Sequence, residues 1–228
     1  MMQLVDIQFT AAMGPPGGGR NHVTFRFLRH FSVISVLDFT PESISRIFSS
    51  LVEVWMRKCN YPSDVQRLKT PMVEATIDIY KTVQRELLPT PAKSHYTYNL
   101  RDISKVFLGL QGAPARCDNY QKIVRIWTHE NLRVFHDRLI DDDDRSWFCN
   151  LIPGILDKHF KEKYVRLFSH LSEGKADPAP AALKDYFVGN YMVPGADPKI
   201  YDEVEGRART RGRRAELRGT AVIVNLLL

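Results

Sequence analysis

The part of the sequence that decides the fold covers residues 87–102 and reads LLPTPAKSHYTYNLRD. It starts at the end of an apolar pattern with helical spacing. Pro89 and Pro91 stop that helix because proline lacks a backbone N–H. Asn99 ends the connection that follows, and asparagine is a preferred N-cap for the next apolar pattern. The stretch therefore predicts one helix, an irregular connection and a second helix.

Helical patterns continue on both sides of this stretch. Upstream, Thr40 and Pro41 supply an N-cap and a proline at the first helical position, ahead of a single apolar face. Further helices are predicted over about residues 65–88 and over residues 120–139. Together with the helix after Asn99, these patterns indicate a bundle of about five helices.

Four aspartates at residues 141–144 precede the last long helix, where negative charge favours a helix start. Four consecutive residues of a helix cannot all face one ion, so we interpret the cluster as a solvated helix start rather than a cation site. Pro153 and Gly154 are a candidate interruption of this helix. His129 and Glu130 lack the second histidine of the zinc motif H-E-x-x-H, and no metal site is predicted.

The first 39 residues have a different pattern. Apolar and polar residues alternate over residues 5–13, which predicts a strand, and residues 31–37 form a second, more apolar β-rich run. A short helical turn is predicted over residues 23–30. The fold class is therefore mostly α with a small β part: two strands followed by an all-helical bundle.

Composition excludes several classes of protein. The chain has 228 residues, of which 44% are hydrophobic and 25% charged, as in ordinary globular proteins. No apolar run reaches the ~18 residues that a membrane span needs. Six arginines and two glutamates lie within residues 205–218, so most of the net charge of +6 belongs to this short tail. The rest of the chain gives no electrostatic reason to expect nucleic-acid binding.

A glycine-rich loop, GPPGGGRN, covers residues 14–21 and is close to the phosphate-binding pattern G-x-x-x-x-G-K-[ST]. Arg20 and Asn21 stand where that pattern needs lysine and a hydroxyl residue. Pro15 and Pro16 also remove backbone N–H donors that would cradle a phosphate. We interpret the loop as a structural or sensor loop.

Three arginines are candidates for phosphate contact. Arg26 and Arg29 lie just ahead of the second predicted strand, and a guanidinium offers a planar fork of donors. They could reach a neighbouring site or form surface salt bridges. Arg101 lies in the first turn of a helix, where a cation interacts unfavourably with the helix dipole. This placement suggests a role for Arg101 other than stabilising the helix. Pairing with Asp102 or a nearby carboxylate is the alternative.

Several of these stretches together resemble the dynein heavy chain of the axonemal type, specifically its third AAA+ module. The match runs from about residue 4 to residue 204, and the resemblance places the end of an α/β subdomain before a helical lid. Residues 197–204, DPKIYDEV, resemble the approach to the fourth module. The stretches that carry the resemblance are FTAAMGPPGGGRN at residues 9–21, FLRHF at 27–31, LLPTPAKSHYTYNLRD at 87–102, WTHE at 127–130 and RVFHDRLI at 133–140.

The resemblance assigns roles to the candidate residues. Arg101 matches the sensor II position, which would contact a γ-phosphate bound by the same module. Arg26 or Arg29 would be the arginine finger, and the resemblance does not choose between them. Gly14 falls at the sensor I position, but many AAA+ modules have a polar asparagine there, and glycine has no side chain to position a water. No catalytic residue is expected in this chain alone.

The resemblance also implies a division of the chain. Residues 1–39 would be the remnant of the α/β subdomain and residues 40–172 the helical lid. Residues 173–204 would be a linker toward the next module. Residues 205–228 do not resemble the expected entry to that module, and we expect an atypical tail that is disordered or aberrant, as from an alternative exon or shifted frame.

By resemblance, the chain is a fragment or short isoform of an axonemal dynein heavy chain, an ATP-driven, minus-end-directed microtubule motor for ciliary movement. The Walker A and B motifs are expected upstream of Met1, so ATP or ADP with Mg²⁺ would bind only in the complete module and the chain alone would be inactive. Its partners would be the rest of the AAA+ ring, intermediate and light chains and microtubules, in the cytoplasm and axoneme. The alternative is a non-enzymatic helical module that binds other dynein subunits, or an unstable truncated product.

Overall fold

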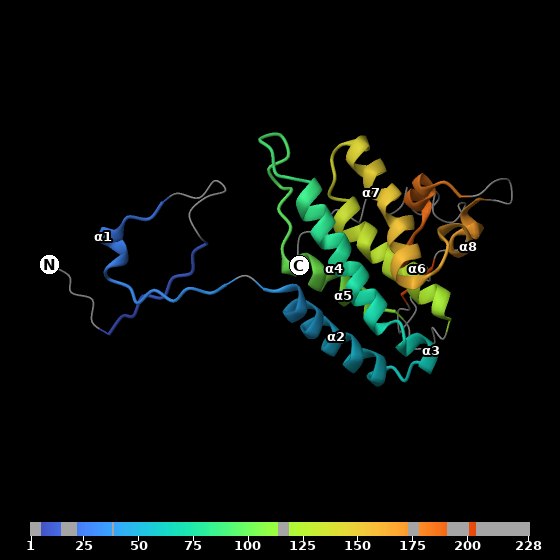
Figure 1. Cartoon of the computed structure of the whole chain (residues 1–228), viewed down its shortest axis with the longest axis horizontal. Helices are drawn as coiled ribbons and strands as arrows, with labels where there is room; N and C mark the ends of the chain where they lie inside the picture. Colours follow the sequence, from blue (N-terminus) through green and yellow to red (C-terminus); the bar gives the residue numbers. More distant parts are fainter. Residues whose placement is uncertain are drawn as a thin grey trace. The chain divides into compact units, whose positions relative to one another are not determined.

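The computed structural model divides the chain into two compact units, Met1–Phe39 and Thr40–Leu228, whose relative placement is not determined (Figure 1). The structure describes residues 6–14, 22–37, 39–113, 119–172, 178–190 and 201–203.

Among its described residues, the first unit contains one short helix, α1 (Phe25–Leu28), where the sequence predicts a helical turn. The two strands predicted at residues 5–13 and 31–37 are wrong, because the described residues of both runs form no strand. Most of their apolar side chains face solvent, with Phe9 74% and Leu37 90% exposed. A buried strand needs neighbours that pair its backbone and cover its side chains, and an apolar pattern cannot supply them.

Helix α2 (Pro41–Lys58) opens the second unit as predicted. The Thr40 hydroxyl accepts a hydrogen bond from the backbone N–H of Ser43 (3.3 Å), and Pro41 occupies the first helical position. The apolar stripe that includes Phe48 and Val52 is buried, and the Phe48 ring stacks on Phe107 with ring centroids 5.0 Å apart.

The single helix predicted over residues 65–88 is divided into α3 (Ser63–Gln66) and α4 (Lys69–Glu86). Pro71 explains the division. It has no N–H to donate to the carbonyl four residues earlier, so it is tolerated only in the first turn of a helix. The chain therefore starts a new helix at Lys69, which puts Pro71 in that first turn.

The helices that follow are close to the predicted ones, but two of them end in wide π-helical turns. The turn η1 extends α6, and η2 extends α7 up to Lys161, whose φ is 54°. Pro153 lies inside α7 without ending it, so the predicted interruption is displaced to the η2 turn. The elements are α5 (Leu100–Leu110), α6 (Tyr120–Asn131), η1 (Leu132–His136), α7 (Asp142–Ile155), η2 (Leu156–Phe160), α8 (Tyr164–Leu167), η3 (Ser169–Ser172) and η4 (Pro180–Asp185).

The β part lies after the bundle rather than before it. Strand β1 (Val188–Gly189) pairs antiparallel with β2 (Asp202–Glu203), with Val188 opposite Glu203. The predicted fold class, mostly α with a small β part, is confirmed, but the strands are different ones. The predicted tail at residues 205–228 and most of the stretch at 197–204 lie outside the described residues.

Helix α4 is the centre of the core, since it contacts α2, α5, α7 and η2 (Figure 1). Trp127 of α6 is fully buried and donates from Nε1 to the Thr76 hydroxyl of α4 (2.9 Å). Cys149 is buried and Cys59 is partly exposed, and both are free thiols. In the part of the chain that the structure describes, no helix is long and apolar enough to cross a membrane.

Candidate functional site

The start of α5 is built by a reciprocal capping box. The Asn99 side chain accepts a hydrogen bond from the backbone N–H of Arg101 (2.9 Å). The Asp102 carboxylate accepts one from the backbone N–H of Asn99 (3.1 Å). Each side chain satisfies an N–H that the helix leaves without a partner, so the backbone around Arg101 is held on both sides.

The Arg101 side chain is exposed and, among the described residues, its guanidinium has no hydrogen bond or ion pair. The alternative of a pair with Asp102 is wrong in this structure. The buried Asp102 carboxylate instead faces Lys105 (3.7 Å) and Arg138 (3.4 Å). Arg101 is thus a cation on a rigid helix start with its donors available to a ligand.

The connection that leads into α5 is held by Arg138, which follows the η1 turn. Its guanidinium donates to the carbonyl oxygens of His95 (2.7 Å) and Thr97 (3.2 Å). It also lies over the Tyr98 ring, 4.7 Å from the centroid. Sequence analysis missed Arg138, because nothing in local spacing links it to residues about 40 positions earlier.

Lys93 attaches the same connection to the start of α7. Its ammonium lies 2.5 Å from Asp141 and 2.6 Å from Asp144, and hydrogen bonds to these carboxylates raise the pKa of Lys93. The buried Tyr96 donates to Asp144 (2.9 Å) and accepts from the backbone N–H of Ile140 (3.1 Å). The aspartate cluster does start α7, as predicted, and two of its members also anchor the connection before Arg101.

Burial and hydrogen bonding shift the pKa of Asp144 in opposite directions. Burial raises the pKa of Asp144, but hydrogen bonds from Lys93 and Tyr96 lower it more, and the net pKa is below its ordinary value. The carboxylate is therefore charged at neutral pH, as the contact with Lys93 requires.

The far end of α5 meets a buried carboxylate. Glu130 of α6 is fully buried against Gly109, and its carboxylate accepts from Arg133 Nε (2.8 Å) and from the Tyr201 hydroxyl. His129 Nδ1 lies 3.2 Å from the same carboxylate. Helix α5, helix α6 and the segment at residues 201–203 thus share one contact point.

Helix α6 holds residues 201–203 by two ion pairs as well. Arg125 makes a two-point contact with Glu203 (2.7 and 3.0 Å), and both side chains are mostly buried. Lys122 lies 2.6 Å from Asp202, and the Tyr186 hydroxyl donates to Glu203 (2.7 Å). The segment after the lid is therefore fixed to the helix that packs on α5.

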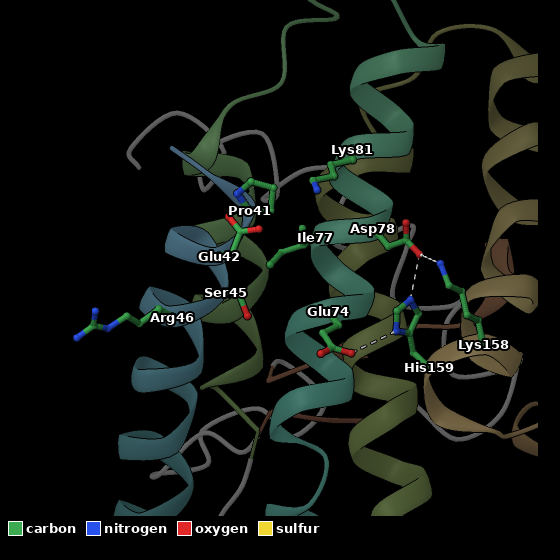
Figure 2. Close-up of a pocket in the computed structure, with 10 residues that line it drawn as sticks. All are labelled: Pro41, Glu42, Ser45, Arg46, Glu74, Ile77, Asp78, Lys81, Lys158 and His159. Carbon is green, nitrogen blue, oxygen red and sulfur yellow. Dashed lines mark hydrogen bonds and ion pairs between the residues drawn. The ribbon is translucent and has the colours of Figure 1, made fainter. Parts of the chain in front are cut away.

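A separate groove of about 600 Å³ lies between α2, α4 and η2 (Figure 2). Asp78 on one wall accepts from Lys158 (2.6 Å) and lies 3.0 Å from His159 Nε2. Burial raises the pKa of Asp78, but these two partners lower it more. The groove carries charges of both signs and contains none of the candidate site residues Gly14, Arg26, Arg29 and Arg101.

The other candidate residues belong to the first unit, which is described by itself. Gly14 lies in an irregular segment. Arg26 is exposed on α1, and Arg29, exposed at its end, donates from Nε to His30 (3.2 Å). Within the described ranges, no group of three or more His, Cys, Asp or Glu side chains could hold a metal ion.

The bundle, with an exposed arginine on its capped α5 start, matches a lid domain of AAA-type proteins. The family described as "Dynein heavy chain, ATPase lid domain" matches residues 55–145, and that described as "P-loop containing dynein motor region" matches residues 1–39. The chain belongs to the dynein heavy chain family.

Its relatives include axonemal heavy chains from several mammals. Dynein axonemal heavy chain 12 of Rattus norvegicus is 44% identical over 204 residues, which cover 88% of this chain and 7% of the relative. Dynein axonemal heavy chain 1 of Homo sapiens is 40% identical over 217 residues, 90% of this chain and 5% of the relative. Dynein axonemal heavy chain 3 of Mus musculus is 39% identical over 229 residues, 100% of this chain and 5% of the relative. The chain thus spans less than a tenth of the length of these relatives.

Proposed function

We propose that this chain works as part of an axonemal dynein heavy chain, in which it forms the end of the third AAA+ module and its lid. In the complete motor, which moves toward microtubule minus ends and drives ciliary movement, the lid closes over ATP. Closure of this kind is a hinge motion that completes a site. The observation that carries the proposal is that the Arg101 guanidinium is exposed on the first turn of α5. The capping box and Arg138 hold this turn in place.

In this role Arg101 contacts the γ-phosphate of ATP bound by the same module. A guanidinium fits this contact because its fork of donors matches phosphate oxygens. Either Arg26 or Arg29 serves the site of a neighbouring module as an arginine finger, and the exposure of both supports this. Gly14, at the sensor I position, has no side chain with which to contribute.

The nucleotide and its Mg²⁺ bind only in the complete module, and the chain alone does not hydrolyse ATP. Through the heavy chain its partners are the rest of the AAA+ ring, the intermediate and light chains and microtubules in the axoneme. Contacts of residues 201–203 with α6 support a role in passing lid motion onward.

Substitution of Arg101 tests this function in an intact heavy chain that carries this sequence. Amide exchange of residues 95–102 is followed while a non-hydrolysable ATP analogue or ADP is titrated, which gives an apparent affinity local to this module. Arg101→Ala should weaken binding of the ATP analogue roughly tenfold, as expected for a lost charged hydrogen bond, and leave ADP unchanged. The control is Arg67→Ala, which removes an exposed arginine elsewhere in the lid. Equal affinities in Arg101→Ala and the parent protein would contradict the role.

A second candidate function is a non-enzymatic module that binds other dynein subunits, or an unstable truncated product. The outer face of α2 favours it, because Ile47, Leu51 and Val54 are 44%, 48% and 65% exposed at helical spacing. Sedimentation of the purified chain with dynein subunits separates the outcomes. A complex of fixed stoichiometry supports the binding module, an insoluble chain supports the truncated product, and a soluble chain that binds none of them contradicts both.

A further inference from the structure

We propose that Arg138 is the positioning residue for Arg101, which it holds in place through the connection before α5 and through Asp102. The inference rests on the proposed function, since it concerns how the sensing arginine is presented. Arg138 itself is not assigned a nucleotide contact, because both of its terminal nitrogens, Nη1 and Nη2, already contact the protein.

The geometry shows one side chain holding both sides of the helix start. On the entering side, Arg138 Nη2 donates to the carbonyl oxygens of His95 and Thr97, and the guanidinium covers the Tyr98 ring. On the helix side, Nη1 lies 3.4 Å from Oδ2 of Asp102. That same oxygen accepts the backbone N–H of Asn99 in the capping box.

The contact with Asp102 also explains why Arg101 remains available. Asp102 is the next residue along the chain, and a carboxylate without a partner would attract the nearest guanidinium. Arg138 and Lys105 lie against its two oxygens instead, and the Asp102 side chain is only 6% exposed. The Asp102 carboxylate is therefore engaged by Arg138 and by the capping box, and does not pair with Arg101.

The contacts run in both directions, because residues of the connection before α5 also bind the backbone around Arg138. His95 Nε2 lies 3.0 Å from the carbonyl oxygen of Arg138, and the Tyr96 hydroxyl accepts from the N–H of Ile140. A shift of the turn between η1 and α7 must therefore move residues 95–98. These residues lead directly into Asn99 and Arg101.

Lysine cannot replace Arg138 in this arrangement. An ammonium is a point charge without the planar fork that reaches two carbonyls and a carboxylate while covering a ring. Arg125 of α6 offers a matched control. It donates to the carbonyl of Leu167 (3.4 Å) and to Glu203 (2.7 Å), so it also makes a backbone and a carboxylate contact, but none to residues 95–102 or to the turn between η1 and α7.

The first measurement uses this chain alone and follows amide exchange of residues 95–102. Arg138→Lys should raise the exchange rates roughly tenfold, which corresponds to the loss of a charged hydrogen bond. Arg125→Lys should leave them unchanged. Unchanged rates in Arg138→Lys would overturn the proposal.

The second measurement uses the intact heavy chain and the local ATP-analogue and ADP affinities. Arg138→Lys should lower the ratio of ATP-analogue to ADP affinity roughly fivefold to tenfold. Since Arg138 acts through Arg101, the double variant Arg101→Ala, Arg138→Lys should be no worse than Arg101→Ala. Full additivity would overturn the proposal, because a general loss of structure adds to the loss of Arg101.

The two hypotheses fail in different ways. If Arg101→Ala leaves the affinity ratio unchanged, the sensing function fails, while exchange in the isolated chain still decides whether Arg138 holds the connection. If Arg101→Ala lowers the ratio and Arg138→Lys does not, the positioning role alone fails. Should Arg138→Lys not fold, Asp102→Asn replaces it, since it keeps an acceptor for the cap but removes the charge that Arg138 faces. An unchanged ratio in Asp102→Asn would then overturn the proposal.

Discussion

Gly109 of α5 packs directly on the carboxylate of Glu130 in α6, and a Cβ atom at position 109 would overlap that side chain. The same Cβ would come 3.0 Å from Nη2 of Arg133, the ion-pair partner of Glu130. The two helices can approach to this distance only because α5 has no side chain here. The buried carboxylate also receives the Tyr201 hydroxyl, so its position affects three parts of the lid.

Substitution of Gly109 should therefore destabilise the chain. Gly109→Ala must displace a buried, paired carboxylate or separate α5 from α6, and we expect the free energy of unfolding to fall by about 2–4 kcal/mol. The matched control is Gly154→Ala in α7, where a Cβ would have no neighbour within 4 Å. That change should be neutral or stabilise by up to about 1 kcal/mol, through helix propensity. Urea denaturation of both variants decides, and equal stabilities would contradict the packing.

Low pH should reduce the stability of the lid because Glu130 becomes protonated. Burial raises the pKa of Glu130, but hydrogen bonds from His129 and Tyr201 and the charge of Arg133 lower it more, to a net value below 4.5. At pH values between that folded pKa and 4.5, Glu130 is protonated more often in the unfolded chain than in the folded one. The stability that Glu130 contributes is therefore fully present above about pH 4.5 and is lost as the pH falls through the folded pKa.

The measurement is the free energy of unfolding from about pH 7 down to about pH 3, for the parent chain and for Glu130→Gln. The variant should be less stable near neutral pH and should lose less stability on acidification. Identical pH slopes in the two proteins would mean that Glu130 contributes nothing to the acid sensitivity.

Two tyrosines in the connection before α5 should respond in opposite ways to loss of the hydroxyl. Tyr96→Phe removes hydrogen bonds to Asp144 and from Ile140, and should lower stability by about 1–2 kcal/mol. Tyr98→Phe removes a buried hydroxyl that has no hydrogen-bond partner among the described residues, so it should be neutral or stabilising. Thermal melting of the pair tests this, and a larger loss for Tyr98→Phe would contradict the arrangement.

Local chemistry predicted part of this fold correctly. Thr40 and Asn99 cap helices, the aspartates start α7, and the prolines after residue 88 end the α4 region, because each effect depends only on neighbouring residues. Pro71 was also visible, but the apolar pattern across it concealed the restart of the helix at Lys69.

Long-range pairing was not predictable in the same way. The hold of Arg138 on Thr97 and the packing of Gly109 on Glu130 join residues far apart in sequence, and no periodicity marks them. The prediction of strands at residues 5–13 and 31–37 was wrong because it relied on local side-chain pattern alone. These residues have the right side chains for strands, but a strand also needs a neighbour with which to pair.

The segment at residues 201–203 should couple to α6 through Arg125 and Glu203. Arg125→Gln and Glu203→Gln should each destabilise the chain, and the double-mutant cycle should give a coupling energy of about 1–3 kcal/mol, because the pair is mostly buried. Urea denaturation of the four proteins measures it. Additive effects would show that the segment is not held by this pair.

The most direct test of the central claim is the position of Arg101 relative to bound nucleotide. The structure of an intact heavy chain carrying this sequence would be determined with a non-hydrolysable ATP analogue and, separately, with ADP. We predict that an Arg101 guanidinium nitrogen lies about 2.7–3.2 Å from a γ-phosphate oxygen with the ATP analogue and faces solvent with ADP. An Arg101 side chain that faces solvent in both states, with nucleotide bound in this module, would contradict the account.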